Sequence, residues 1–188
     1  MEHPDTLASM HNLAWTYNKQ GCTEEAEQLE LQILELKKRV LRVEHPDTLA
    51  SMHNLTWTYS RQGQMEEAEQ LHLQVLELRR RVLGVEHPAT LRTMHNLALT
   101  YDQRGWTEKA EQLQLQVLKS MRRVLGAEHP DTLMTMHNLA LTYNGQGWMG
   151  KAEKLYLQVL ESMRRVLGLE HPDTLMTMQA LANTQRAS

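Results

Sequence analysis

Apolar residues recur along the chain with helical spacing, in two alternating kinds of segment. In the first kind, represented by residues 4–20, Leu7, Met10 and Ala14 are spaced by three and four residues, which places them on one face of a helix. In the second kind, represented by residues 23–41, apolar positions form a stripe over more than half of the helix circumference. A stripe that broad implies packing against several neighbouring helices. Because neither segment shows the alternation typical of strands, the pattern predicts an all-α protein.

The two segments repeat with one fixed period. The dipeptide His-Pro occurs at intervals of 42 residues, beginning at His3, His45, His87, His129 and His171. A fixed period of about 20–50 residues is typical of a repeat array. We therefore expect one domain over residues 1–188, a right-handed α-solenoid of four 42-residue helix-turn-helix repeats plus a C-terminal capping helix. The predicted repeats are residues 2–43, 44–85, 86–127 and 128–169, with a capping half repeat at 170–188.

The residues at segment ends predict how the helices begin and end. Pro4 suits a first helical turn, and Gly21 is expected to end the first helix. Thr23 is expected to cap the second helix. Glycine occupies the position after the second helix in three repeats, whereas Arg42 occupies it in the first repeat. We therefore expect that junction either to be strained by about 1 kcal/mol or to end differently.

Composition narrows the classes of partner and compartment. The net charge of −3 gives no electrostatic reason to expect a nucleic-acid partner. The single cysteine, Cys22, excludes an intramolecular disulfide and fits a reducing compartment. No apolar run reaches the roughly 18–20 residues needed to span a bilayer, and the N-terminal residues lack the pattern of a signal peptide. We therefore expect a cytoplasmic protein with no membrane partner.

The sequence offers no convincing catalytic or metal site. Histidines followed by asparagine recur once per repeat, but equivalent residues on stacked helices lie about 8–10 Å apart or more. Two ligands of one zinc ion each lie about 2.0–2.1 Å from it. Residues 145–151 match the phosphate-loop pattern G-x-x-x-x-G-K, but a predicted helix precedes them and Ala152 replaces the required Ser or Thr. We expect no cofactor, no metal and no enzymatic activity.

The repeat residues resemble a known family. The segment from Leu13 to Gly21, Leu-Ala-x-x-Tyr-x-x-x-Gly, followed by Ala26, resembles the tetratricopeptide signature, and Tyr156 fits its later aromatic position. The 42-residue period, with E-H-P-[DA]-T-L and H-N-L-A, is similar to repeats of the kinesin light chain and nephrocystin type. Such repeats also form the C-terminal sensor arrays of fungal NLR-like NTPases. The resemblance covers essentially the whole chain and implies a tetratricopeptide repeat domain.

The resemblance also implies a ligand-facing surface on the first helix of each repeat. In this family the first helices line the concave side of the solenoid. The corresponding positions are His11, Asn12, Trp15 and Lys19 in repeat one; His53, Asn54, Trp57 and Arg61 in repeat two; Arg92, His95, Asn96 and Leu99 in repeat three; and Met134, His137, Asn138 and Leu141 in repeat four. We call the residues at equivalent positions of successive repeats a column. The ligand-facing columns also include Ala8, Asn18, Asp102 and Asn144.

These columns suit an extended peptide. Asparagine can donate to and accept from a peptide backbone, and tryptophan or leucine can supply apolar pockets. The alternative is that the asparagines bond neighbouring helices and the tryptophans simply pack. If the amides bind peptide, replacing Asn96 and Asn138 by Ala should abolish binding and leave the melting temperature nearly intact. Because Lys19, Arg61 and Arg92 outnumber Asp102, a mild preference for acidic ligands is expected.

The sequence therefore predicts a non-catalytic scaffold that binds an extended peptide or partner protein along its concave face. The alternative function is a structural or self-assembling repeat module, such as the sensor fragment of a larger NLR-like NTPase. Apolar residues persist at both ends of the repeat array, so we also expect a fragment with weak end-to-end self-association. The identity of the ligand does not follow from the sequence.

Overall fold

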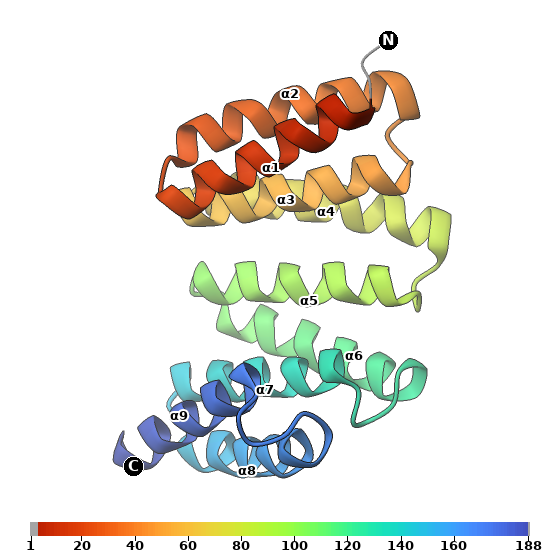
Figure 1. Cartoon of the computed structure of the whole chain (residues 1–188). Helices are drawn as coiled ribbons and strands as arrows, with labels where there is room; N and C mark the ends of the chain where they lie inside the picture. Colours follow the sequence, from red (N-terminus) through yellow and green to blue (C-terminus); the bar gives the residue numbers. More distant parts are fainter. Residues whose placement is uncertain (1–3, 188) are drawn as a thin grey trace. The chain divides into compact units, whose positions relative to one another are not determined.

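The computed structural model describes residues 4–187, and within this range it contains α-helices and no strands (Figure 1). The helices are α1 Pro4–Gln20, α2 Thr23–Leu41, α3 Pro46–Gln62, α4 Met65–Leu83, α5 Pro88–Gln103, α6 Thr107–Val124, α7 Pro130–Gly145, α8 Met149–Val166 and α9 Pro172–Ala187. Each repeat is a pair of helices joined by a short turn, and the last helix stands alone, so the all-α repeat-solenoid fold is confirmed. None of the helices in this range combines the length and the apolar character that crossing a bilayer requires.

The chain divides into two compact units, which we call the first unit, Met1–Val82, and the second unit, Leu83–Ser188. In the first unit α2 packs against α1 and α3, and Leu34, Leu49 and Val75 belong to one buried cluster that joins α2, α3 and α4. In the second unit α6 packs against α5 and α7, and α8 packs against α7 and α9. The second helices α2, α6 and α8 are thus each covered by two first helices, which explains their broad apolar stripes.

The recurring Glu-His-Pro-x-Thr-Leu motif begins the first helices α3, α5, α7 and α9. In α3, Pro46 occupies the first turn and the Nδ1 atom of His45 accepts a hydrogen bond of 3.2 Å from the N–H of Asp47. The same cap is made by His87, His129 and His171 at 3.1, 3.1 and 3.2 Å. These histidines therefore cap their helices through Nδ1, which accepts from a backbone N–H of the first turn.

The threonine of the motif closes the loop before it. The Oγ1 atom of Thr48 donates to the carbonyl oxygen of Arg42 at 2.8 Å, and this contact recurs at 2.9 Å between Thr90 and Gly84. The glutamate of the motif contacts an arginine near the end of the second helix of its own repeat, as in the exposed pair Glu44 and Arg81. Exposed pairs of this kind contribute about 0–1 kcal/mol, so the buried threonine is the stronger constraint on the loop.

The residue at the position of Arg42, just after the second helix, has a positive φ angle in every repeat. Gly84, Gly126 and Gly168 have φ values of 92°, 101° and 93°. Arg42 takes the same place with φ 74° and ψ 162° and is the only residue other than glycine with positive φ among residues 4–187. This backbone region belongs essentially to glycine, and a side chain there costs about 1–3 kcal/mol. The expectation of a strained junction at Arg42 is confirmed.

The predicted cap of the second helix was wrong. Thr23 is the first residue of α2, and the cap position belongs to Cys22, which makes no side-chain capping bond. The backbone explains the shift, because Gly21 has φ 83° and the N–H of Cys22 donates to the carbonyl oxygen of Tyr17 at 2.9 Å. The turn therefore closes on the preceding helix and places residue 22, not 23, at the entrance of α2.

Candidate protein-interaction surface

A pocket with a volume of about 280 Å³ opens in the first unit among α1, α2 and α3. We call it the repeat-one pocket. It is lined by His11, Trp15 and Asn18 of α1, Glu30 of α2, and His53, Asn54 and Trp57 of α3. The α1 and α3 residues belong to the columns predicted to face a ligand, whereas Glu30 lies on the second helix and was not predicted.

Trp15 and Trp57 give the pocket exposed aromatic surface. Their side chains are 60% and 44% exposed, so they are not packed in the interior. Lys19 Nζ lies 5.0 Å from the centroid of the Trp15 ring, and Arg61 Cζ lies 5.0 Å from that of Trp57. Each cation follows its indole by one helical turn, a spacing that brings side chains together on a helix surface. The indoles therefore remain accessible to a further apolar or cationic group.

The basic residues of the predicted surface already make contacts with their own chain. Arg61 Nη1 donates to the backbone carbonyl of Asn18 at 2.6 Å. In the second unit, Arg92 Nη1 lies 3.5 Å from Asp131 Oδ2. Together with Lys19 over the Trp15 ring, these contacts hold all three cations that suggested an acidic ligand. Of these three contacts, only that of Arg92 is with a carboxylate, and the expected preference for an acidic ligand stays a prediction.

A buried polar network forms the floor of the repeat-one pocket. Asn18 Nδ2 donates to Thr58 Oγ1 at 2.8 Å, and Thr58 Oγ1 donates to Glu30 Oε2 at 2.7 Å. Asn18 and Glu30 are only 1% and 5% exposed. The Oδ1 atom of Asn18 has no hydrogen-bond partner among the described residues. Burial raises the pKa of the Glu30 carboxyl, and nearby Glu27 raises it further, while the hydrogen bond from Thr58 acts in the opposite direction.

The histidine and asparagine columns bond each other between successive first helices. Asn54 Nδ2 contacts His11 Nε2 within the first unit, and Asn138 Nδ2 lies 3.1 Å from His95 Nε2 within the second. The alternative interpretation, in which asparagine bonds a neighbouring helix, is therefore correct for Asn54 and Asn138. Removing the Asn138 amide would also affect folding, contrary to the expectation of an unchanged melting temperature.

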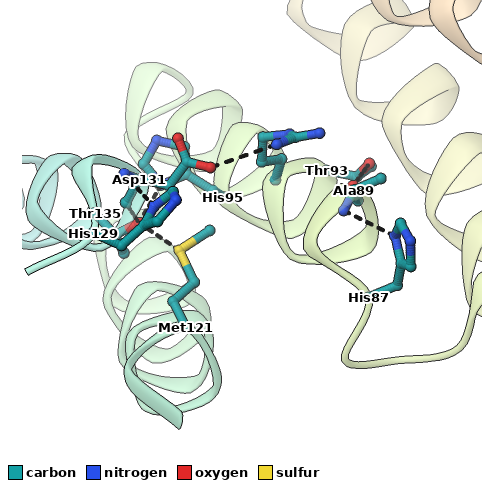
Figure 2. A network of polar contacts seen from close by, with 9 residues as sticks. His87, Ala89, Thr93, His95, Met121, His129, Asp131 and Thr135 are labelled. Carbon is teal, nitrogen blue, oxygen red and sulfur yellow. Dashed lines mark hydrogen bonds and ion pairs between the residues drawn. The ribbon is translucent and has the colours of Figure 1, made fainter. Parts of the chain in front are cut away.

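Hydrogen bonds around His95 indicate which ring nitrogen carries its proton. Because Asn138 Nδ2 donates to Nε2 of this ring, the proton of the neutral imidazole is on Nδ1, which donates to Thr135 Oγ1 over 3.1 Å. Thr135 in turn donates to the carbonyl oxygen of Asp131 at 2.8 Å (Figure 2). Burial lowers the pKa of His95 to about 4, with Asp131 acting in the opposite direction. His95 is thus a neutral link between helices at neutral pH.

The remaining predicted residues differ in their access to solvent. In repeat one Asn12 is exposed. In repeat four Leu141 is 43% exposed, but Met134 packs against the buried cluster of the second unit. His137 is only 2% exposed, because its ring packs against Tyr156 with centroids 5.5 Å apart. His137 is therefore removed from the surface that the sequence predicted for a ligand.

Glu30 is the pocket residue that the sequence analysis missed. Its equivalents one, two and three periods later are His72, Gln114 and Tyr156, and all four side chains are buried. A polar residue recurring within the apolar stripe of the second helix was the available signal. Such a column marks a place where the interior accepts hydrogen-bonding groups.

Comparisons with known proteins agree with this geometry. A family model described as tetratricopeptide repeat matches residues 17–80 and 58–122, and a second model of the same description matches residues 132–173. Two crystal structures of a kinesin light chain-type protein of Podosopora anserina, with nearly identical TPR-like repeats, are similar to the chain at 37% identity. They align over 100% of this chain and 88% and 89% of theirs, with TM-scores of 0.81 and 0.79.

A more distant structure supports the fold alone. BtubC from P. vanneervenii is 23% identical, with a TM-score of 0.80 over 95% of this chain and 71% of its own. No curated protein matches the chain.

Proposed function

Because the chain belongs to the tetratricopeptide repeat family, we propose that it is a non-catalytic scaffold that binds an extended peptide segment of a partner protein along its first helices. Repeats of this family generally mediate protein–protein interactions. The observation that carries the proposal is the repeat-one pocket, in which two exposed indoles converge with buried polar groups.

The size of the pocket favours a single side chain as its occupant. Ligand pockets for drug-sized molecules are about 300–1,000 Å³, and the repeat-one pocket is at the lower limit with about 280 Å³. A peptide lying along α1 and α3 can insert one side chain there while its backbone continues over the helix surface. Tryptophan is one of the residue types that contribute most to binding energy in protein interfaces.

The structural role of the asparagines is compatible with peptide binding. Asn54 and Asn138 each use the Nδ2 atom in the contact with histidine. Their Oδ1 atoms accept no hydrogen bond from the part of the chain that the structure describes. Both side chains are half-buried rather than enclosed. A backbone N–H of a bound peptide could therefore bond to each amide oxygen without displacing the histidine.

Selection from a random peptide display library tests the proposal. Peptides enriched on the parent chain should bind the double variant Trp15→Leu, Trp57→Leu at least about tenfold more weakly, because indole anchors are lost. Leucine is the natural residue at the equivalent positions Leu99 and Leu141, so the fold should tolerate it. Trp148→Leu, which removes an indole 42% exposed at another place, is the matched control.

Two results would contradict the proposal. One is that no peptide is enriched, and the other is that enriched peptides bind the double variant and the parent equally. Light scattering on the same sample addresses the alternative function. A self-assembling module should increase in mass with concentration, and it should do so whether or not peptide is added.

A further inference from the structure

The carboxyl group of Glu30 is buried without a positively charged partner. Its Oε2 atom accepts the hydrogen bond from Thr58, and no Lys, Arg or His within residues 4–187 forms an ion pair with it. Of the charged neighbours, only Glu27 contributes to the pKa shift of Glu30, and it raises that pKa. Buried carboxylates in proteins are normally paired or bonded on both oxygens. The second oxygen of Glu30 is therefore available to a donor inside the repeat-one pocket.

A second buried acceptor lines the same pocket. Asn18 is 1% exposed, its Nδ2 atom is used by Thr58, and its Oδ1 atom has no partner among the described residues. A buried oxygen without a hydrogen-bond partner is less stable than one that accepts a hydrogen bond. Both Asn18 and Glu30 line the pocket. A ligand group with several N–H donors would therefore satisfy two acceptors at once.

We propose that the repeat-one pocket binds an arginine side chain of the peptide ligand, with the guanidinium group donating to Glu30 and Asn18 beside the indole rings of Trp15 and Trp57. This inference rests on the proposed function and specifies the ligand of that same surface. The guanidinium group is planar, carries five N–H donors and stacks on aromatic faces. A lysine ammonium is a compact point charge and would use the indole faces and the two acceptors less completely.

Lys19 and Arg61 do not occupy this place. Both lie over the indole rings on their own helices, and Arg61 also donates to the backbone carbonyl of Asn18 rather than to its side chain. Neither forms an ion pair with Glu30. The chain thus already places cations on both indoles while leaving the buried carboxyl uncompensated.

The repeat-one pocket would also fix the register of a bound peptide relative to the repeats. The column of Glu30 continues as His72, Gln114 and Tyr156, so the carboxylate occurs in the first repeat alone. Repeats with nearly the same first-helix columns give an extended peptide few reasons to prefer one alignment. An arginine that fits a single repeat would fix the alignment of the peptide along the chain.

A titration with small molecules tests the inference without any peptide. The probe is Nα-acetyl-arginine N-methylamide, and the comparison molecule is its citrulline analogue, which has the same shape without the charge. Indole N–H signals of the four tryptophans are followed by heteronuclear NMR and assigned from single Trp→Leu variants. We expect saturable shifts at Trp15 and Trp57 with the arginine probe only.

Variants of the pocket residues identify the groups that bind the arginine probe. Glu30→Gln should weaken probe binding about tenfold or more, since glutamine keeps an acceptor oxygen but lacks the negative charge that strengthens the hydrogen bond. Gln114 shows that the fold accepts glutamine in this column, where it is fully buried. Glu35→Gln changes an exposed carboxylate of the same helix that contacts Lys38, and it should leave binding unchanged. If Glu30→Gln reduces folding, Trp57→Leu provides an independent test, with a loss of binding expected.

Several outcomes would overturn the inference. These are equal shifts with the citrulline analogue, unchanged binding in both Glu30→Gln and Trp57→Leu, and shifts confined to Trp106 and Trp148. The probe titration and the peptide selection test different proposals, so one can give a negative result without the other. Probe binding without peptide enrichment would contradict the proposed function alone, whereas peptide enrichment with no arginine dependence would contradict this inference alone.

Discussion

The repeat-one pocket of the first unit and the α7–α9 region of the second unit share one polar frame. Asn18 Nδ2 donates to Thr58 Oγ1 at 2.8 Å in the former, and Asn144 Nδ2 donates to Thr184 Oγ1 at 2.6 Å in the latter. In both cases the two residues are 40 positions apart in the sequence, and their hydrogen bond joins successive first helices. The positions of the first helices are therefore set in the same way in both regions.

The two regions differ in what the second helix places against this frame. In the first unit Glu30 leaves a pocket of about 280 Å³ between the helices. In the second unit Tyr156 takes the equivalent position, is fully buried, and packs edge-on against His137. One column on the second helix thus decides whether the space beside the first helices is filled by the chain itself or left open for a ligand.

The largest expected effect concerns the filled region. Replacing Tyr156 by Ala should destabilise the second unit by about 3–5 kcal/mol, because a fully buried aromatic ring is replaced by a cavity. Urea denaturation monitored by circular dichroism measures the change. Tyr156→Phe should be nearly neutral, since the hydroxyl group has no partner among the described residues. A loss in the Phe variant as large as in the Ala variant would contradict the role assigned to the ring.

The next effect tests the bond between first helices. Asn138→Ala removes the donor to His95 Nε2, and an unpaired buried acceptor should cost about 1–3 kcal/mol. Asn12→Ala changes the same column where the side chain is exposed, and it should shift stability by less than about 0.5 kcal/mol. The denaturant midpoints of the two variants, each compared with that of the parent, measure these changes in stability. Equal midpoints would mean that the contact with His95 adds no stability.

A smaller effect is expected at the strained junction of the first unit. Arg42→Gly should stabilise the protein by about 1 kcal/mol by relieving a positive φ angle of 74°. Gly126→Arg in the second unit is the reciprocal variant and should destabilise by a similar amount, because Gly126 has φ 101°. A Cβ atom added at Gly126 would meet nothing within 4 Å, so the cost is conformational. Thermal melting of both variants reveals whether the two signs are opposite.

The smallest effect is a change in pH dependence. The pKa of Glu30 in the folded state is raised above its ordinary value of 4.5, mainly by burial. The protonated carboxyl is therefore favoured by folding, and this contribution is present below the ordinary pKa and is lost as pH rises through the folded-state pKa. Glu30→Gln should accordingly gain stability relative to the parent between pH 4 and pH 7. Denaturation of both proteins across this range would show a constant difference if the inference about burial is wrong.

Several residues show how far sequence analysis could reach. Trp15, Asn54 and Trp57 were predicted from helical spacing and family resemblance, and all three line the repeat-one pocket. His137 was predicted from the same column, yet it is buried against Tyr156. A helical period identifies the face on which a side chain lies but not the size of the side chain that meets it from another helix. For the same reason Glu30, on a different helix, was missed.

The sequence by itself determined the features that depend on a few neighbouring residues. The period of 42 residues, the entry of each first helix at proline and the positive φ angles of the glycines follow from local backbone restrictions and apolar spacing. Tertiary structure alone decided that Asn54 bonds His11, that His137 is buried and that Glu30 is buried without a cation. These outcomes depend on side chains from different helices that pack at contact distance, so their free energies cannot be assigned from one segment alone.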